Sequence, residues 1–191
     1  MKLRSIPLVV AGGLLAASAA FAQPPAPGPV GIATGLQRAY AQMKTNLTQA
    51  ADKMSEADYA FKPVPDIRGF GGQLAHVAQF HYLFCAGAKG VQNPNQENLE
   101  QTKAAKADVV KALADSFAFC DDAFSSLTDE SAVQTVTQGR GGPTARAVVL
   151  TNLIAHDNEE YGIVTVYLRL KGMVPPSTEN AGRGRGGRGR Q

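Results

Sequence analysis

The chain has 191 residues, a formal net charge of +3 and an apolar fraction of 44%. This length allows one compact domain and excludes two substantial hydrophobic cores. The positive charge comes from six basic residues at the ends of the chain: Lys2, Arg4, Arg183, Arg185, Arg188 and Arg190. Without them the rest of the chain has a net charge of −3. This balance excludes a basic nucleic-acid-binding face on the folded part.

Residues 1–22 have the features of a signal peptide. Lys2 and Arg4 precede an apolar run, which ends in the small-x-small pattern Ala20-Phe21-Ala22 of a signal-peptidase site. We expect cleavage after Ala22 and export to the periplasm or the medium. The run is short and is interrupted by proline and glycine, so an uncleaved membrane anchor is disfavoured and no transmembrane segment is expected in the mature chain.

The first part of the mature chain is predicted to be an extended leader followed by a helix. Residues 23–31, QPPAPGPVG, are too rich in proline and glycine for regular structure. The folded domain is predicted to span residues 32–176. Its first helix should run from Leu36 to Met54, because apolar residues recur there at alternating spacings of four and three. Residues 61–72, FKPVPDIRGFGG, then form a linker, since two prolines forbid a continuous helix.

Three further helices follow in the predicted order. The second is expected from Gly69 to Lys89 and the third from Gln96 to Leu127, with a break around Pro94 between them. Residues 128–145 have glycines and a proline but no sustained period, and predict an irregular connection. The fourth helix should span Thr144 to Lys171 and stop at Gly172. No strand signal competes, so the predicted fold is all-α, a four-helix bundle.

The C-terminal segment, residues 177–191, is predicted to be a disordered tail rich in arginine and glycine, because it has no apolar residue to anchor it. Arginine-glycine repeats occur in RNA-binding tails. On an exported protein, however, a solubilising or surface-adhering tail is favoured. A tether to anionic envelope surfaces is a further, weaker hypothesis.

Cys85 and Cys120 are the only cysteines. Export would place them in an oxidising compartment, where an intramolecular disulfide can persist. Two small buried hydrophobic side chains are an equally good interpretation, because the sequence does not show whether the Cα atoms lie close enough to be bridged.

The fourth predicted helix carries an ionisable pair in the middle of its apolar stripe. On a helical wheel, His156 and Glu160 share one narrow arc with Val149, Leu153, Ile163 and Tyr167. A carboxylate on a buried face needs a partner, a proton or a cation. Helix two offers His76, near the edge of its own apolar face, and the three residues would make a two-histidine, one-carboxylate metal site.

A metal-free arrangement is the alternative for these residues. The His-x-x-x-Glu spacing is a weak signal, and by itself it favours a hydrogen-bonded histidine–glutamate pair in the core or a glutamate at a wet cavity mouth. His81 lies some 140° from His76 on the same helix. It is therefore predicted to be a satisfied core or surface histidine and not a ligand.

Three segments together resemble the DinB-like superfamily of four-helix-bundle proteins: FKPVPDIRGF, GGQLAHVAQFHYLFC and LIAHDNEEYGIVTVYLRLKGMVPP. The resemblance covers most of the chain from Gly35 to Ser177. It implies a divalent-metal site made by three histidines, one on the second helix and two, four residues apart, on the fourth. His76 and His156 match the first two, but the third position is Glu160. Glutamate also ligates zinc, iron, nickel or manganese, so the resemblance favours a metal site with an altered ligand set.

The resemblance also implies an activity, since the superfamily includes thiol-dependent transferases and isomerases. Because small thiol cofactors are chiefly cytosolic, a metal-dependent hydrolase would suit an exported protein better than a thiol transferase. The substrate is not identified, and no general base is assigned; Asp157, Glu159 and Tyr161 are candidates only because they are near in sequence. The alternative is a non-enzymatic cell-envelope binding or structural bundle that has lost the metal. A homodimer is possible in either case.

Overall fold

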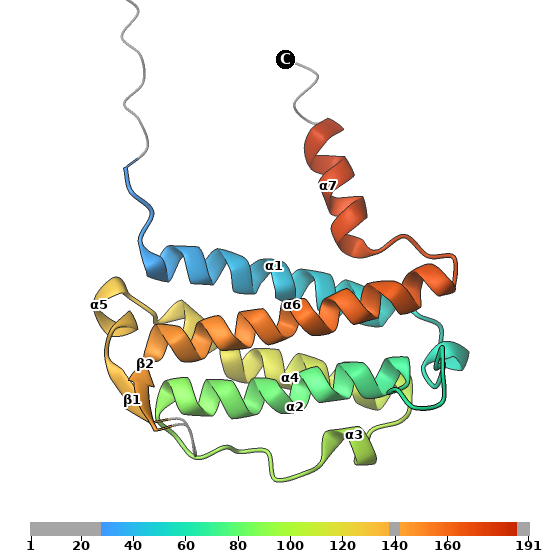
Figure 1. The fold of residues 1–191 in the computed structure, drawn as a ribbon, viewed down its shortest axis with the longest axis horizontal. Helices are drawn as coiled ribbons and strands as arrows, with labels where there is room; N and C mark the ends of the chain where they lie inside the picture. The colour runs from blue at the N-terminus through green and yellow to red at the C-terminus, as the bar shows by residue number, and fades with distance from the viewer. Residues whose placement is uncertain (1–27, 138–141, 187–191) are drawn as a thin grey trace, which may run out of the picture.

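The structure is a computed structural model that describes residues 28–137 and 142–186, and the side chains up to residue 182 (Figure 1). The predicted signal peptide and most of the predicted leader lie outside the described residues. Four long helices form a bundle, which confirms the predicted all-α, four-helix-bundle fold; they are α1 (Ile32–Lys53), α2 (Phe70–Lys89), α4 (Lys106–Ser125) and α6 (Arg146–Leu170).

The direction of the four helices determines how the chain connects them. Helices α1 and α6 run in the same direction, and α2 and α4 run in the opposite one (Figure 1). Each of the four packs against two of the others: α2 lies against α4 and α6, and α1 lies against the same two helices from the other side. Every long helix therefore buries a broad face instead of a single narrow stripe.

The third predicted helix is shorter than expected, because α2 and α4 are parallel. The chain leaves the end of α2 and must return to the end where α2 begins before α4 can start (Figure 1). This crossover holds a single turn, α3 (Leu99–Thr102), and an extended break precedes Lys106. The prediction of one helix from Gln96 to Leu127 was wrong, since a continuous helix cannot provide this return.

Short elements complete the two ends of the bundle. A 3-10 turn (Glu56–Asp58) lies between α1 and α2. The connection between α4 and α6, predicted to be irregular and without strands, contains α5 (Asp129–Ala132) and a small antiparallel pair, β1 (Thr135–Thr137) and β2 (Pro143–Ala145). Strands of three residues are too short to produce an alternating pattern that a sequence can reveal.

Part of the predicted disordered tail is a helix. Helix α7 (Pro176–Gly186) begins with a proline, which is favourable at the first helical position because its fixed φ suits a helix. Lys53 of α1 forms an ion pair with Glu179, and the backbone N–H of Ser177 donates to the hydroxyl of Tyr161 at 2.9 Å. These polar contacts replace the apolar anchor whose absence suggested disorder. Residues 187–191 lie outside the described part.

The core of the bundle is apolar and aromatic. The largest fully buried side chains include Phe70, Phe117, Phe124, Leu153 and Tyr167. Helix α6 stops where the sequence predicted, because Gly172 has a φ of 72°, a left-handed conformation that favours glycine. None of the described helices is long and apolar enough to cross a membrane.

Candidate metal site

The three predicted ligands meet between two antiparallel helices. His76 lies on α2, and His156 and Glu160 lie one turn apart on α6. His76 and Glu160 are buried, with 9% and 6% of their surfaces exposed, and His156 is partly buried. Because α2 and α6 are neighbours in the bundle, side chains on their facing surfaces point into the same space.

The distances between the facing atoms are nearly equal. His76 Nε2 lies 3.2 Å from His156 Nε2 and 3.5 Å from Glu160 Oε1, and His156 Nε2 lies 3.6 Å from that same oxygen. A point equidistant from three atoms with these separations lies about 2 Å from each of them, close to the length of a zinc–nitrogen or zinc–oxygen bond. The three residues therefore fit a single metal ion.

The hydrogen bonding of His76 orients it toward this point. Its Nδ1 lies 2.5 Å from Glu100 Oε1. Since a carboxylate only accepts, this contact places the ring hydrogen on Nδ1 and leaves the lone pair of Nε2 directed at His156 and Glu160. Histidine ligands of metals usually donate their second N–H to a carboxylate in this way.

Glu100 is a functional candidate that the sequence interpretation missed. Arg68 Nε donates to Glu100 Oε2 at 2.7 Å, so the carboxylate bridges Arg68 and His76. Burial favours a raised pKa for Glu100, but the hydrogen bonds and charges of Arg68 and His76 outweigh it and hold the pKa below its ordinary value. Glu100 belongs to the single turn α3, in the crossover that the sequence predicted to be part of a long helix. Only the return of the crossover along α2 brings it to His76.

Two buried atoms of the cluster have no hydrogen-bond partner among the described residues. They are Glu160 Oε2 and His156 Nδ1. The nearest carboxylate oxygen given for His156 Nδ1 is Asp157 Oδ1, at 3.9 Å, which is too long for a hydrogen bond. A buried polar atom without a partner is costly, and a group that keeps such atoms in a native fold is a candidate for function.

Aromatic rings cover one side of the cluster. The ring of Phe80 stacks on His156 with centroids 4.7 Å apart, and it also lies 4.5 Å from the ring of His76. Phe84, one turn further along α2, lies 6.0 Å from His156. These rings exclude water from that side and restrict the rotation of both imidazoles.

His81 occupies a separate, closed site, which confirms its prediction as a satisfied core histidine. Its Nδ1 lies 2.9 Å from Ser116 Oγ, and its Nε2 lies 3.0 Å from Asp157 Oδ1. All three residues are fully buried. Burial alone would raise the pKa of the Asp157 carboxyl, but the interactions with His81 and His156 outweigh it, and the pKa lies below its ordinary value.

The other acids and hydroxyls near the cluster in sequence do not join it. Asp157 pairs with His81, and Glu159 is exposed to solvent. The Tyr161 hydroxyl accepts a hydrogen bond from Ser177 at the start of α7. Ile163, predicted to be on the buried stripe, is 38% exposed because it lines an open pocket.

The two cysteines that the sequence left undecided are joined. Cys85 of α2 and Cys120 of α4 form a disulfide, with their Cα atoms 5.4 Å apart. Both residues are fully buried. The bond ties together the two parallel helices on the side of the bundle that holds His81.

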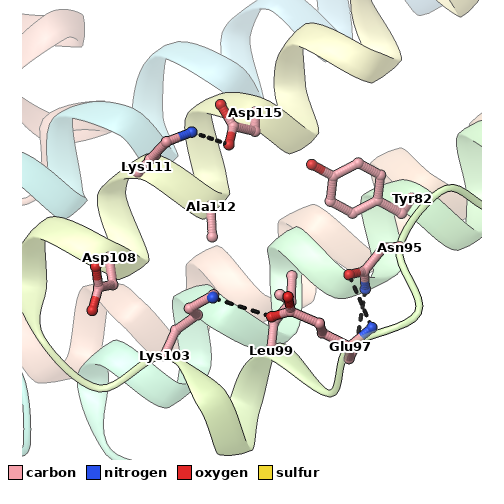
Figure 2. Close-up of a pocket in the computed structure, with 9 residues that line it drawn as sticks. All are labelled: Tyr82, Asn95, Glu97, Leu99, Lys103, Asp108, Lys111, Ala112 and Asp115. Atoms are coloured by element: carbon pink, nitrogen blue, oxygen red, sulfur yellow. Dashed lines mark hydrogen bonds and ion pairs between the residues drawn. The ribbon is translucent and has the colours of Figure 1, made fainter.

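A separate hollow lies outside the bundle, between α4 and the crossover (Figure 2). Five charged side chains line it, and all of them except Asp108 pair with one another. Lys103 Nζ lies 3.1 Å from Glu97, and Lys111 Nζ lies 2.6 Å from Asp115. Asn95 donates to the backbone oxygen of Glu97 within its own loop. Because most of its charged groups already have partners, the hollow is a weaker candidate than the histidine cluster.

The fold and the cluster define a class: helical bundles with a metal-type donor set between two helices. The family model for the DinB superfamily matches residues 39–164. The chain therefore belongs to the DinB superfamily, and this confirms the resemblance found in the sequence.

Solved structures agree with this assignment at the level of the fold. A DinB-like protein from Bacillus cereus aligns with a TM-score of 0.64 at 17% identity, over 74% of this chain and 94% of that one. A DinB-like protein from Bacillus subtilis has a TM-score of 0.59 at 17% identity, over 73% and 94% of the two chains. A conserved protein from Enterococcus faecalis has a TM-score of 0.59 at 15% identity, over 74% and 98%. No curated protein matches the chain.

Proposed function

We propose that this protein binds a divalent metal ion through His76, His156 and Glu160 and is an exported member of its superfamily. The observation that carries the proposal is the near-equal spacing of two ring nitrogens and a carboxylate oxygen around one point, at 3.2, 3.5 and 3.6 Å from one another. With the hydrogen of His76 on Nδ1, the lone pair of its Nε2 faces the negatively charged carboxylate of Glu160, and the two repel each other. A cation resolves this repulsion.

The donor set suits several metals. Two imidazole nitrogens and one carboxylate oxygen are compatible with zinc, nickel, iron or manganese. Such an ion, held by three protein ligands, leaves positions for a water or a substrate group and lowers the pKa of a bound water. This chain's own residues prepare the site: Glu100 orients His76, and Phe80 shields both imidazoles from solvent.

We further propose a metal-dependent hydrolase or transferase activity, of which hydrolysis is favoured. An exported enzyme meets an oxidising compartment with few small thiols, whereas water is always available. The disulfide between Cys85 and Cys120 supports export, because such bonds are rare in proteins that remain in the cytosol.

The test is the metal content of the purified protein, prepared without a histidine tag. We expect a stoichiometric amount of one divalent metal in the wild type, and its loss in His156→Ala and Glu160→Gln. Glu160→His should retain metal, because imidazole also ligates these ions. Glu159→Gln is the matched control, since it neutralises an exposed carboxylate next to Glu160. A wild type that binds none of the four metals would refute the proposal.

The rival is a bundle without metal, with a binding or structural role in the cell envelope. One observation favours it: His76 Nε2 lies within hydrogen-bonding distance of His156 Nε2, so a proton could hold the two rings together. This rival leaves the buried Glu160 Oε2 without a partner, as does a metal ion bound through Oε1 alone. It predicts that Glu160→Gln changes neither ligand binding nor any activity.

A further inference from the structure

A pocket of about 610 Å³ lies next to the candidate metal site. It is formed by the α1–α2 linker, the start of α2 and the second half of α6, and its lining residues are Asp66, Ile67, Arg68, Gln73, Ile163 and Tyr167. Gln73 precedes His76 by one turn on α2, and Ile163 follows Glu160 by one turn on α6. The pocket therefore lies about one helical turn from His76 on α2 and from Glu160 on α6.

Gln73 supplies a donor that nothing in the described protein uses. The residue is only 2% exposed, and its Nε2 has no hydrogen-bond partner among the described residues. A buried amide nitrogen without an acceptor is destabilising, and native proteins rarely keep one without a reason. A ligand oxygen in this pocket would satisfy it.

Arg68 adds a second donor to the same pocket. Its Nε is occupied by Glu100, and none of the described residues accepts a hydrogen bond from its two terminal nitrogens. Its backbone is fixed, because the Tyr167 hydroxyl donates to the Arg68 carbonyl at 2.6 Å. A guanidinium and an amide that line one pocket offer donors for the two oxygens of a carboxylate.

The remaining lining residues narrow the class of ligand. Ile67, Ile163 and Tyr167 present apolar surface, which suits a hydrocarbon chain or ring. Asp66 adds one negative charge, so the pocket carries one charge of each sign. A ligand with two negative charges, such as phosphate, would be repelled by Asp66 more strongly than one with a single carboxylate.

We propose that this pocket binds a small organic monocarboxylate, with its carboxylate held by Arg68 and Gln73 and its hydrocarbon part against Ile67, Ile163 and Tyr167. As the substrate class of the metal site this rests on the proposed function, since only the adjacent ion would act on the bound compound. The contacts with Arg68 and Gln73 themselves need no metal.

The experiment titrates the wild-type protein with isovalerate, with its uncharged analogue isovaleramide and with inorganic phosphate, and follows the backbone amide signals by NMR. We expect isovalerate to shift the signals of the pocket and to bind about tenfold or more tightly than isovaleramide and phosphate, because a hydrogen bond to a charged group is stronger than one to a neutral group. Gln73→Leu should weaken isovalerate binding about tenfold, and Gln73→Glu should abolish it.

Asn46→Leu is the matched control, because Asn46 is also a buried amide, at 4% exposure, but lies on α1. It should leave isovalerate binding unchanged. Equal binding of isovalerate and isovaleramide, or unchanged affinity in Gln73→Leu, would overturn the inference. The content of zinc, nickel, iron and manganese is measured on the same samples, and Gln73→Leu should retain the metal of the wild type. A wild type that holds none of the four metals would overturn the proposed function and not the carboxylate site.

Discussion

Two histidine clusters lie within the same bundle, and they differ in how completely their polar atoms are satisfied. Around His81, both ring nitrogens have partners at 2.9 and 3.0 Å, and every member of the group is fully buried. Around His76 and His156, two ring nitrogens and a carboxylate oxygen lie 3.2 to 3.6 Å from one another, and two further buried atoms have no partner among the described residues. The first cluster has its polar atoms paired, whereas the second leaves polar atoms unpaired among the described residues.

The largest expected difference between the clusters is in stability. Asp157→Ala should lower the free energy of unfolding by about 3–5 kcal/mol, because it leaves His81 buried without its charged partner. Glu160→Ala, three residues further along α6, should change it by less than about 1 kcal/mol, because one of its oxygens is already unpaired. Urea unfolding of the metal-free proteins measures both values. Equal losses would mean that the two clusters do not differ in this way.

Removing the disulfide should lower the stability of the protein but leave its metal affinity unchanged. The double variant Cys85→Ala, Cys120→Ala opens a loop of 35 residues and should cost about 2–4 kcal/mol. Cys85 lies one turn beyond His81, on the closed side of α2, so metal affinity should be retained wherever the variant is folded. Urea unfolding and zinc titration are compared with those of the wild type. A parallel loss of zinc affinity would show that the cluster of His76 and His156 depends on the cluster of His81.

Glu100→Gln should weaken metal binding at the cluster of His76 and His156. A glutamine side chain at this position cannot fix the hydrogen of His76 on Nδ1 as a carboxylate does, so metal affinity should fall by about 10–100-fold. Competition with a chelating dye measures the affinity. Glu97→Gln is the control, because Glu97 lies in the same crossover but pairs with Lys103. An unchanged affinity in Glu100→Gln would exclude an orienting role for Glu100.

The smallest expected effect concerns the hydrogen-bonded hydroxyl of Tyr40, near the cluster of His81. Tyr40 donates to the Phe117 carbonyl at 3.0 Å, and Phe117 packs on His81. Burial, with the nearby Asp121 carboxylate, raises the pKa of Tyr40 above its ordinary value of 10.0. The folded protein therefore keeps this proton after the unfolded chain has lost it. Stability from Tyr40 is complete below about pH 10 and decreases as the pH rises further.

Tyr40→Phe should lose about 1 kcal/mol near neutral pH and show a shallower fall in stability above about pH 10 than the wild type. Urea unfolding at a series of alkaline pH values tests this. Identical slopes for the two proteins would mean that Tyr40 ionises alike in the folded and unfolded states.

The sequence was sufficient for the helices that bury a regular stripe. Apolar spacing located α1, α2 and α6 to within a few residues, and the wheel placed His156 and Glu160 on one buried face of α6. His76 was found near the edge of the apolar face of α2, and the resemblance to the superfamily supported that choice. These inferences succeeded because they depend on residues within one helix, where a period of 3.6 fixes which side chains share a face.

The tertiary structure decided everything that depends on contacts between distant segments. The wheel puts Asp157 outside the arc of His156 and Glu160, but α6 packs against both α1 and α2, so a second face is buried and Asp157 meets His81 there. Glu100 reaches His76 only because parallel helices require a crossover along α2. The helix α7 forms where polar contacts with α1 and α6 replace apolar anchoring. Helical periodicity determines which side chains share a face, but the packing of the helices determines what each face meets.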